Sequence, residues 1–169
     1  MSRPARLLSL PKLTALGLAA AASVAAAPSV ADAGRPFEMF AGEWNGSGQI
    51  VDSKGARERI RCRADFTEAH EGAALNQSIV CASSSYKIDI SSYAEASGGS
   101  VKGTWSESTR GFTGQLTGRV GNGRFEGVVI GPGFSASVSL TSNGRRQAVT
   151  IQPQGGEIAD VRIELERGG

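Results

Sequence analysis

The stretch LTGRVGNGRFEGVV, residues 116–129, decides the fold. It alternates apolar or small residues with polar ones on both sides of Asn122-Gly123. This dipeptide is typical of the two-residue turn of a β-hairpin, because both central positions need positive φ. Such a turn fixes which residues face each other, and facing residues point to the same side of the sheet. The facing pairs are all apolar or small: Val120 with Phe125, Gly118 with Gly127, and Leu116 with Val129. The stretch therefore predicts a hairpin with one apolar face.

The same pattern repeats along the chain from Gly42 onward. Runs of roughly nine residues alternate apolar and polar positions, each run ends at a turn signal, and no run has helical periodicity. The turn signals are Lys54-Gly55, Glu71-Gly72, Ser83-Ser84, Gly98-Gly99, Arg110-Gly111, Asn122-Gly123, Pro132-Gly133, Asn143-Gly144 and Gln154-Gly155-Gly156. The sequence therefore predicts an antiparallel meander of ten strands.

Ten short strands with one apolar face need that face covered and their edges paired. Closing the sheet into a barrel achieves both. We therefore expect an all-β fold, an up-and-down antiparallel barrel of about ten strands, as a single domain over residues 34–169. Gly103, Gly118 and Gly127 fall on its inner face. We interpret them as permitting strong coiling of the sheet, the alternative being that they leave room for a ligand.

The other turns predict further cross-strand pairs. Around the Glu71-Gly72 turn, Cys62 faces Cys81, and around Gly98-Gly99, Glu95 faces Lys102. Two cysteines facing each other in an exported chain predict a cross-strand disulfide. With a single histidine they do not predict a zinc site, and no metal or cofactor is expected. Further expected pairs are Ile50 with Ile60, Trp105 with Leu116, Val101 with Val120, Val138 with Val149, and Ala136 with Ile151.

Residues 1–33 have the pattern of a secretory signal peptide. Arg3, Arg6 and Lys12 precede an uncharged run over residues 13–27, and Ala31-Asp32-Ala33 has small residues where a signal peptidase cleaves. The run is too short for a comfortable membrane span. We expect export through the Sec pathway to the periplasm or beyond, with no membrane span.

The basic character of the chain belongs to this leader. The whole chain has a net charge of +2, and the leader contributes three positive charges and one negative, so the mature domain has a net charge of 0. Nucleic-acid binding needs a positive field over a surface of the domain. No nucleic-acid partner is therefore expected.

The mature domain opens with Phe40-Ala41-Gly42-Glu43-Trp44-Asn45-Gly46. A Gly-x-Trp at the start of the first strand of a meander resembles the calycins, that is, the lipocalin, fatty-acid-binding and avidin-like barrels. The resemblance implies a closed barrel with an apolar lumen, in which Trp44 closes one end and Arg167, from the end of the last strand, packs across it. The chain is also similar to small exported Gram-negative proteins of unknown function.

Two candidate binding surfaces follow from the strand pattern. The inner face should line a lumen for a small apolar ligand, with Trp44, Ile50, Phe66, Ile79, Ile88, Trp105, Leu116, Val129, Val138, Val149 and Ile163 on its wall. Arg57, Arg59, Arg61 and Arg63 recur at strand period and so share one outward strip, with no carboxylate expected on either flank. Forked guanidinium hydrogen bonds suit phosphate or another anionic envelope component. The alternative is a solvated outer face that discourages edge pairing.

Residues able to perform catalysis are few. No nucleophile, zinc or phosphate-loop motif occurs, and His70, the only histidine, is expected to be a solvated turn residue. Glu107 falls on the apolar face near a strand end, where we expect it to reach solvent at the barrel rim. A buried Glu107 would be expected to have a raised pKa and to mark the lumen as functional.

The sequence therefore predicts an exported, non-enzymatic binding module. The alternative is a structural or envelope-interaction protein with a filled core and no ligand, and an enzyme using Glu107 comes third. An outer-membrane barrel, with apolar residues outside, would show the same alternation. Short connections at both ends and the lack of paired aromatic girdles argue against it.

Overall fold

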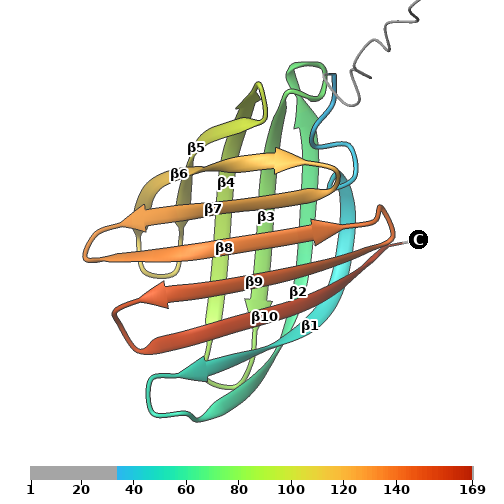
Figure 1. The fold of residues 1–169 in the computed structure, drawn as a ribbon. Coiled ribbons are helices and arrows are strands. Elements are labelled where there is room, and N and C mark those ends of the chain that lie inside the picture. The colour runs from blue at the N-terminus through green and yellow to red at the C-terminus, as the bar shows by residue number, and fades with distance from the viewer. Residues whose placement is uncertain (1–33, 169) are drawn as a thin grey trace, which may run out of the picture.

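The computed structural model describes residues 34–168, and these form an all-β barrel (Figure 1). The predicted signal peptide, residues 1–33, lies outside the described residues. The strands are β1 (Gly42–Asp52), β2 (Arg57–Ala69), β3 (Ala74–Ala82), β4 (Lys87–Ser97), β5 (Ser100–Glu107), β6 (Phe112–Gly121), β7 (Arg124–Gly131), β8 (Phe134–Ser142), β9 (Arg146–Gln154) and β10 (Ile158–Arg167), with a 3₁₀ turn η1 (His70–Gly72) between β2 and β3.

The ten strands form one closed antiparallel sheet. Each strand pairs with its neighbours in sequence, and β1 pairs with β10 to complete the circle. Every predicted turn signal falls at a connection between two of these strands. The predicted ten-stranded up-and-down barrel is confirmed.

The expected register is confirmed at three turns. Across the turn at Asn122 and Gly123, where φ is +51° and +67°, Val120 pairs with Phe125 and Gly118 with Gly127. Glu95 pairs with Lys102 on β4 and β5. Cys62 pairs with Cys81 on β2 and β3, and the two sulfurs form the predicted disulfide.

The predicted register of the first hairpin is wrong by two residues. Ile60 faces Gly48, and Ile50 faces Glu58 instead of Ile60. The cause is Asp52, whose Oδ1 accepts hydrogen bonds from the backbone N–H groups of Lys54 and Ala56 at 2.9 and 2.8 Å. This side-chain cap centres the connection on Lys54 instead of Gly55, so both strands keep their faces but slide along each other.

Two later hairpins differ in the same way. In β5 and β6, Trp105 faces Gly114 instead of Leu116, and Glu107 faces Phe112 across a four-residue connection. In β8 and β9, Val138 faces Ile151 instead of Val149, because Asn143 precedes the turn and its Oδ1 accepts from the N–H groups of Arg145 and Arg146. The remaining pairs of these hairpins are likewise corrected: Val101 faces Gly118, and Ala136 faces Pro153.

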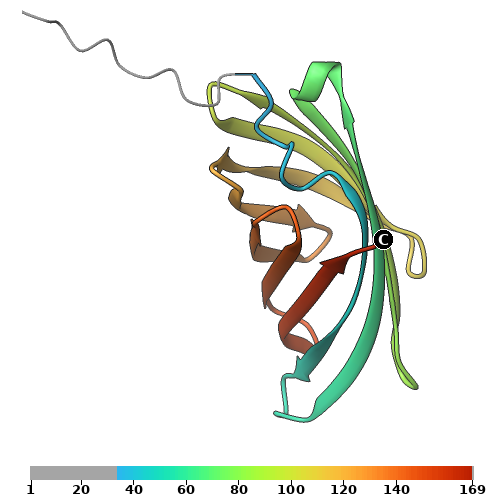
Figure 2. The ribbon, with the colours of Figure 1, turned by 90° about the vertical axis from the view of Figure 1, so that its right-hand side faces the viewer.

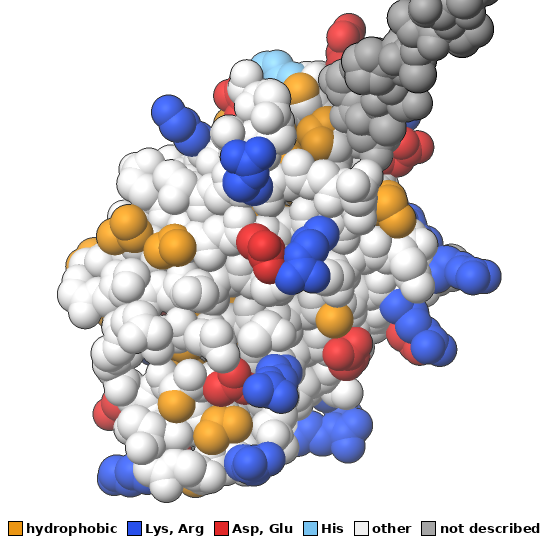
Figure 3. Space-filling model, in the orientation of Figure 1, with side chains coloured by type: hydrophobic (Ala, Val, Ile, Leu, Met, Phe, Trp, Pro, Cys, Tyr) orange, Lys and Arg blue, Asp and Glu red, His pale blue; other side chains and the backbone are white. Residues whose placement is uncertain are grey.

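Apolar side chains gather inside the barrel and polar ones outside. On β2, for example, Ile60, Cys62, Ala64 and Phe66 are buried and the residues between them are exposed. Figure 3 shows charged groups of both signs scattered over one face of the barrel. Within residues 34–168 no helix has the length and apolarity needed to cross a membrane.

The inward-facing glycines permit close approach of neighbouring strands. A Cβ on Gly118 would lie 2.4 Å from the backbone oxygen of Glu126 and 2.7 Å from the Phe125 ring. A Cβ on Gly103 would lie 2.1 Å from the backbone oxygen of Tyr93. These positions are filled by neighbouring strands and by Phe125. The curvature interpretation is therefore favoured over room for a ligand.

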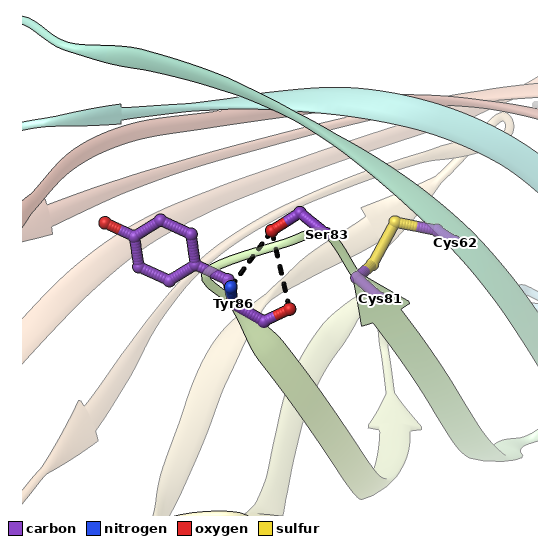
Figure 4. The surroundings of a disulfide bond; sticks show 4 residues. All are labelled: Cys62, Cys81, Ser83 and Tyr86. Carbon is purple, nitrogen blue, oxygen red and sulfur yellow. Dashed lines mark hydrogen bonds between the residues drawn. A yellow bond between two sulfur atoms is a disulfide. The ribbon is translucent and has the colours of Figure 1, made fainter.

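The disulfide joins β2 to β3 close to the turn that leads into β4 (Figure 4). In that turn the Ser83 hydroxyl accepts a hydrogen bond from the backbone N–H of Tyr86 at 3.0 Å. Cys62 and Cys81 are both buried. The bridge therefore fixes this part of the wall from within the core.

Candidate functional site

A cavity of about 550 Å³ runs through the inside of the barrel. Ligand pockets in proteins typically have volumes of about 300–1,000 Å³. The volume therefore argues against the alternative of a filled core. Its wall is mainly apolar, formed by Ile60, Phe66, Leu75, Ile79, Ile88, Ile90, Ala94, Trp105, Leu116, Phe125, Val129, Ala136, Val138, Leu140, Val149, Ile151, Val161 and Ile163.

One end of the cavity is closed by the segment that precedes β1. Phe37 and Phe40 are buried and line the cavity floor. The carbonyl of Phe40 accepts hydrogen bonds from Trp44 Nε1 and from Gln147 Nε2, both at 2.9 Å. Figure 2 shows this segment crossing the end of the barrel where β1 begins and β10 ends. The two aromatic side chains therefore form a fixed floor.

Trp44 and Arg167 complete the closed end. They face each other on β1 and β10, and the Arg167 guanidinium carbon lies 4.6 Å from the centre of the Trp44 ring. Trp44 is fully buried. A cation over an indole face at this distance is a favourable cation–π contact. The packing that the calycin resemblance implied for this pair is confirmed.

The opposite end of the cavity lies among the turns of the barrel. Arg110, Pro132, Gly133 and residues 155–157 line the cavity there, and all of them belong to connections between strands. Aromatic rings stand beside these turns: Phe134 lies 5.6 Å from Trp105 and 6.2 Å from Phe112, measured between ring centres. Phe112 is 38% exposed. The cavity therefore reaches exposed residues at this end, which carries an aromatic rim.

A hydrogen-bonded polar pair lies within the mainly apolar wall, in addition to Glu107. Ser92 Oγ donates a hydrogen bond to Gln77 Oε1 at 2.6 Å, and both side chains line the cavity. The amide nitrogen of Gln77 makes no hydrogen bond within residues 34–168. It is therefore a free donor that faces the cavity.

The structure places most of the predicted lumen residues on the cavity wall. Phe66, Ile88, Trp105, Leu116 and Val138 all line the cavity. So do Ile79, Val129, Val149 and Ile163. Trp44 and Ile50 do not line the cavity, although both are buried in the core.

Glu107 corrects an expectation. It is buried, with only 6% of its surface exposed, instead of reaching solvent at the rim. Burial acts to raise its pKa, but hydrogen bonds from the Thr109 hydroxyl and from the backbone N–H groups of Thr109, Asp89 and Arg110 outweigh burial, and the net pKa is lowered. Its carboxylate therefore caps the turn between β5 and β6 and does not have the raised pKa of a buried general acid.

The four arginines of β2 lie on one exposed outer strip, as predicted. Among residues 34–168 none of them forms an ion pair. Their neighbours on β1 are neutral: Arg57 donates to Gln49, Arg59 to Ser47, and Arg63 to Asn45, at 3.3–3.4 Å. Arg61 lies between Arg59 and Arg63 on the same face. The four guanidiniums therefore have no ion-pair partner among the described residues, and the next residue along the same face is Asp65.

His70 lies exposed in η1, as expected for a turn residue, with its ring centre 6.4 Å from that of Tyr93. In the described part of the chain, no three His, Cys, Asp or Glu side chains come together in an arrangement that could hold a metal ion.

Neither a protein-family model nor a curated protein matches the sequence. Among solved structures, the chain is similar to Rv2717c from M. tuberculosis, with a TM-score of 0.63, 13% identity, and coverage of 79% of this chain and 95% of that one. It is similar to the S-type phycobiliprotein lyase CpeS from Guillardia theta, with a TM-score of 0.55, 13% identity, and coverage of 79% and 90%.

A third similar structure is a DUF3598 protein from Nostoc punctiforme. The TM-score is 0.57 at 13% identity, and the match covers 80% of this chain but only 50% of that one. The chain thus spans about half the length of this protein. These likenesses show the fold alone, a ten-stranded antiparallel barrel.

Sequence reasoning missed the floor and the polar pair. Phe37 and Phe40 precede the first alternating run, so no strand pattern assigned them to a face. Two phenylalanines three residues apart, directly before the Gly-x-Trp, were the available signal. Gln77 and Ser92 occupy inward positions that parity alone would have identified.

Proposed function

We propose that the protein is an exported, non-enzymatic binding module that takes up one small apolar molecule inside the barrel. The observation that carries the proposal is the continuous apolar cavity of about 550 Å³ between an aromatic floor and the turns at the opposite end. Apolar surface buried on binding contributes about 25 cal/mol per Å². A ligand of this kind needs no charged partner inside the barrel.

The polar pair narrows the ligand class. The free amide nitrogen of Gln77 would donate a hydrogen bond to an acceptor on the ligand, such as a carbonyl oxygen. A molecule with an apolar body and one acceptor group would therefore bind better than a plain hydrocarbon. One of the similar barrels is by name a phycobiliprotein lyase, so a function beyond a filled scaffold is compatible with this fold.

Export is part of the proposal. It is supported by the signal-peptide pattern of residues 1–33 and by the Cys62–Cys81 disulfide, since disulfides persist mainly in oxidising compartments. Fractionation of cells that express the full chain would place the cleaved protein in the periplasm or the medium. Uncleaved protein retained in the cytoplasm would contradict this part.

The cavity is tested with 1-N-phenylnaphthylamine, a neutral fluorescent apolar probe. We predict saturable binding by the mature protein, accompanied by increased fluorescence. Val138→Trp puts an indole into the cavity and should abolish binding, because the side chain occupies the ligand volume. Val149→Trp, from the neighbouring strand, provides a second cavity-filling variant should the first fail to fold.

Ser137→Trp is the matched control. Ser137 is adjacent to Val138 on β8 but is exposed on the outer face, so this variant should bind the probe as the wild type does. Absence of saturable binding by the wild type, or equal loss of binding in both variants of β8, would contradict the proposal.

The arginine strip supports a second candidate function, the binding of an anionic surface. Its four guanidiniums lack carboxylate partners in the described residues. Each basic residue near an anionic membrane contributes about 1 kcal/mol. We predict that Arg59→Ser with Arg61→Ser lowers the partition of the protein onto vesicles containing phosphatidylglycerol by about thirty-fold at low salt.

Arg119→Ser with Arg145→Ser removes the same charge from other exposed positions and serves as the control. The strip accounts for binding only if the control keeps most of the wild-type partition. Equal losses in the two double variants would assign any vesicle binding to net charge alone.

A further inference from the structure

The outer face of β2 to β6 carries a second hollow, separate from the cavity inside the barrel. Its volume is about 710 Å³. Two cross-strand rows of outward side chains form it. The first row is Asp65, Ser78, Ser91, Ser106 and Thr113, and the second is Asn76, Tyr93, Thr104 and Gln115.

The chemistry of this groove is uniform. Apart from Asp65 at one end, every side chain in the two rows is an uncharged hydroxyl or amide. Within residues 34–168, none of these hydroxyl and amide groups donates a hydrogen bond to the protein or accepts one from it. Their donors and acceptors are therefore all available to a ligand.

Apart from Asp65, charged side chains lie only outside the groove. Glu95 and Lys102 face each other in the row beyond Tyr93 and Thr104, and Arg63 and Asp89 lie on either side of Val80 in the row beyond Ser78. Each of these rows carries both signs of charge. The groove therefore offers many hydrogen-bonding groups and no net positive charge that would select an anion.

The geometry of the rows adds a length scale. Neighbouring strands lie about 4.8 Å apart, so each row repeats a polar group at that spacing across the sheet. This repeat is comparable with the length of one ring in an extended sugar chain. Tyr93, half-buried in the second row and contacted edge-on by His70, presents an aromatic ring beside the polar groups. Hydroxyls, amides and an aromatic ring together match the polar edges and apolar faces of sugar rings.

We propose that this groove binds a neutral oligosaccharide, with the chain running across β3 to β6. The hydroxyl and amide side chains hydrogen-bond the sugar hydroxyls, and Tyr93 packs against a ring face. The two rows that carry this site lie on the outer face and line no part of the apolar cavity, although Gln77, Ser92 and Trp105 border both hollows.

The test is a titration of the isotope-labelled mature protein with cellohexaose and chitohexaose, followed by amide chemical shifts. We expect saturable shifts at millimolar sugar, confined to the outer residues of β3 to β6. Ser91→Trp, at the centre of the first row, should weaken binding by about ten-fold or more. Asn76→Ala with Gln115→Ala removes two amides without adding bulk and should also weaken it.

Ser137→Trp places the same side chain on the outer face of β8, away from the groove, and should bind both sugars as the wild type does. Binding of 1-N-phenylnaphthylamine in the cavity shows that each variant is folded. Because this binding is measured independently of sugar binding, failure of one proposal can be distinguished from failure of the other. The proposal is overturned if neither neutral sugar shifts the groove residues, if Ser91→Trp binds as tightly as the wild type, or if only an acidic sugar such as hexagalacturonate binds.

Discussion

At the scale of single residues, Glu107 explains how a buried carboxylate is kept ionised inside an apolar wall. Four hydrogen-bond donors converge on its two oxygens, from Thr109, Arg110 and Asp89. Parity predicted from the sequence that the side chain faces inward. It did not predict the lowered pKa, because three of the donors belong to a turn that is longer than the sequence suggested, and the fourth is the backbone N–H of Asp89 on β4.

We predict that Glu107→Ala destabilises the protein by about 1–3 kcal/mol, because buried N–H groups of the turn lose their acceptor. Since the folded-state pKa of Glu107 is lowered, its contribution is complete above the ordinary glutamate pKa of about 4.3 and is lost as the pH falls below it. Urea unfolding at neutral pH and at about pH 3 checks both statements. A difference between wild type and variant that stays constant over this range would contradict the role of the ionised form.

At the scale of elements, the faces of the strands were predictable and the register was only partly so. Alternation fixes which side of a strand is apolar, and closed turns such as Asn122-Gly123 fix its partner. Where Asp52, Asn143 or Glu107 caps the backbone of a turn, the connection lengthens or moves, and the register shifts by two residues. A shift of two preserves every face, so the predicted lumen residues remained inward although several of their partners changed.

The disulfide between β2 and β3 gives a prediction at this scale. It closes a loop between positions separated by 19 residues. A loop of this size should contribute about 3 kcal/mol to stability. Cys62→Ala with Cys81→Ala should lose that amount in chemical denaturation, and wild type treated with reductant should unfold at the same denaturant concentration as the double variant. An unchanged midpoint in both would contradict a structural role for the bridge.

At the scale of the whole molecule, closing the sheet leaves space that the sequence pattern alone could not measure. Inward positions were identified, but the volume between them depends on strand tilt and on the floor formed by Phe37 and Phe40, which precede the first strand. The arginine strip was predictable because its members share one strand. The outer groove was not predictable, because its two rows cross five and four strands and require the final register.

Native mass spectrometry of the mature protein, isolated from its own cells without organic solvent, tests the proposed apolar-ligand function most directly. We predict a species heavier than the bare chain by one small apolar molecule, and the loss of that species in Val138→Trp but not in Ser137→Trp. The bare mass alone, together with no binding of added 1-N-phenylnaphthylamine, would contradict a ligand inside the barrel.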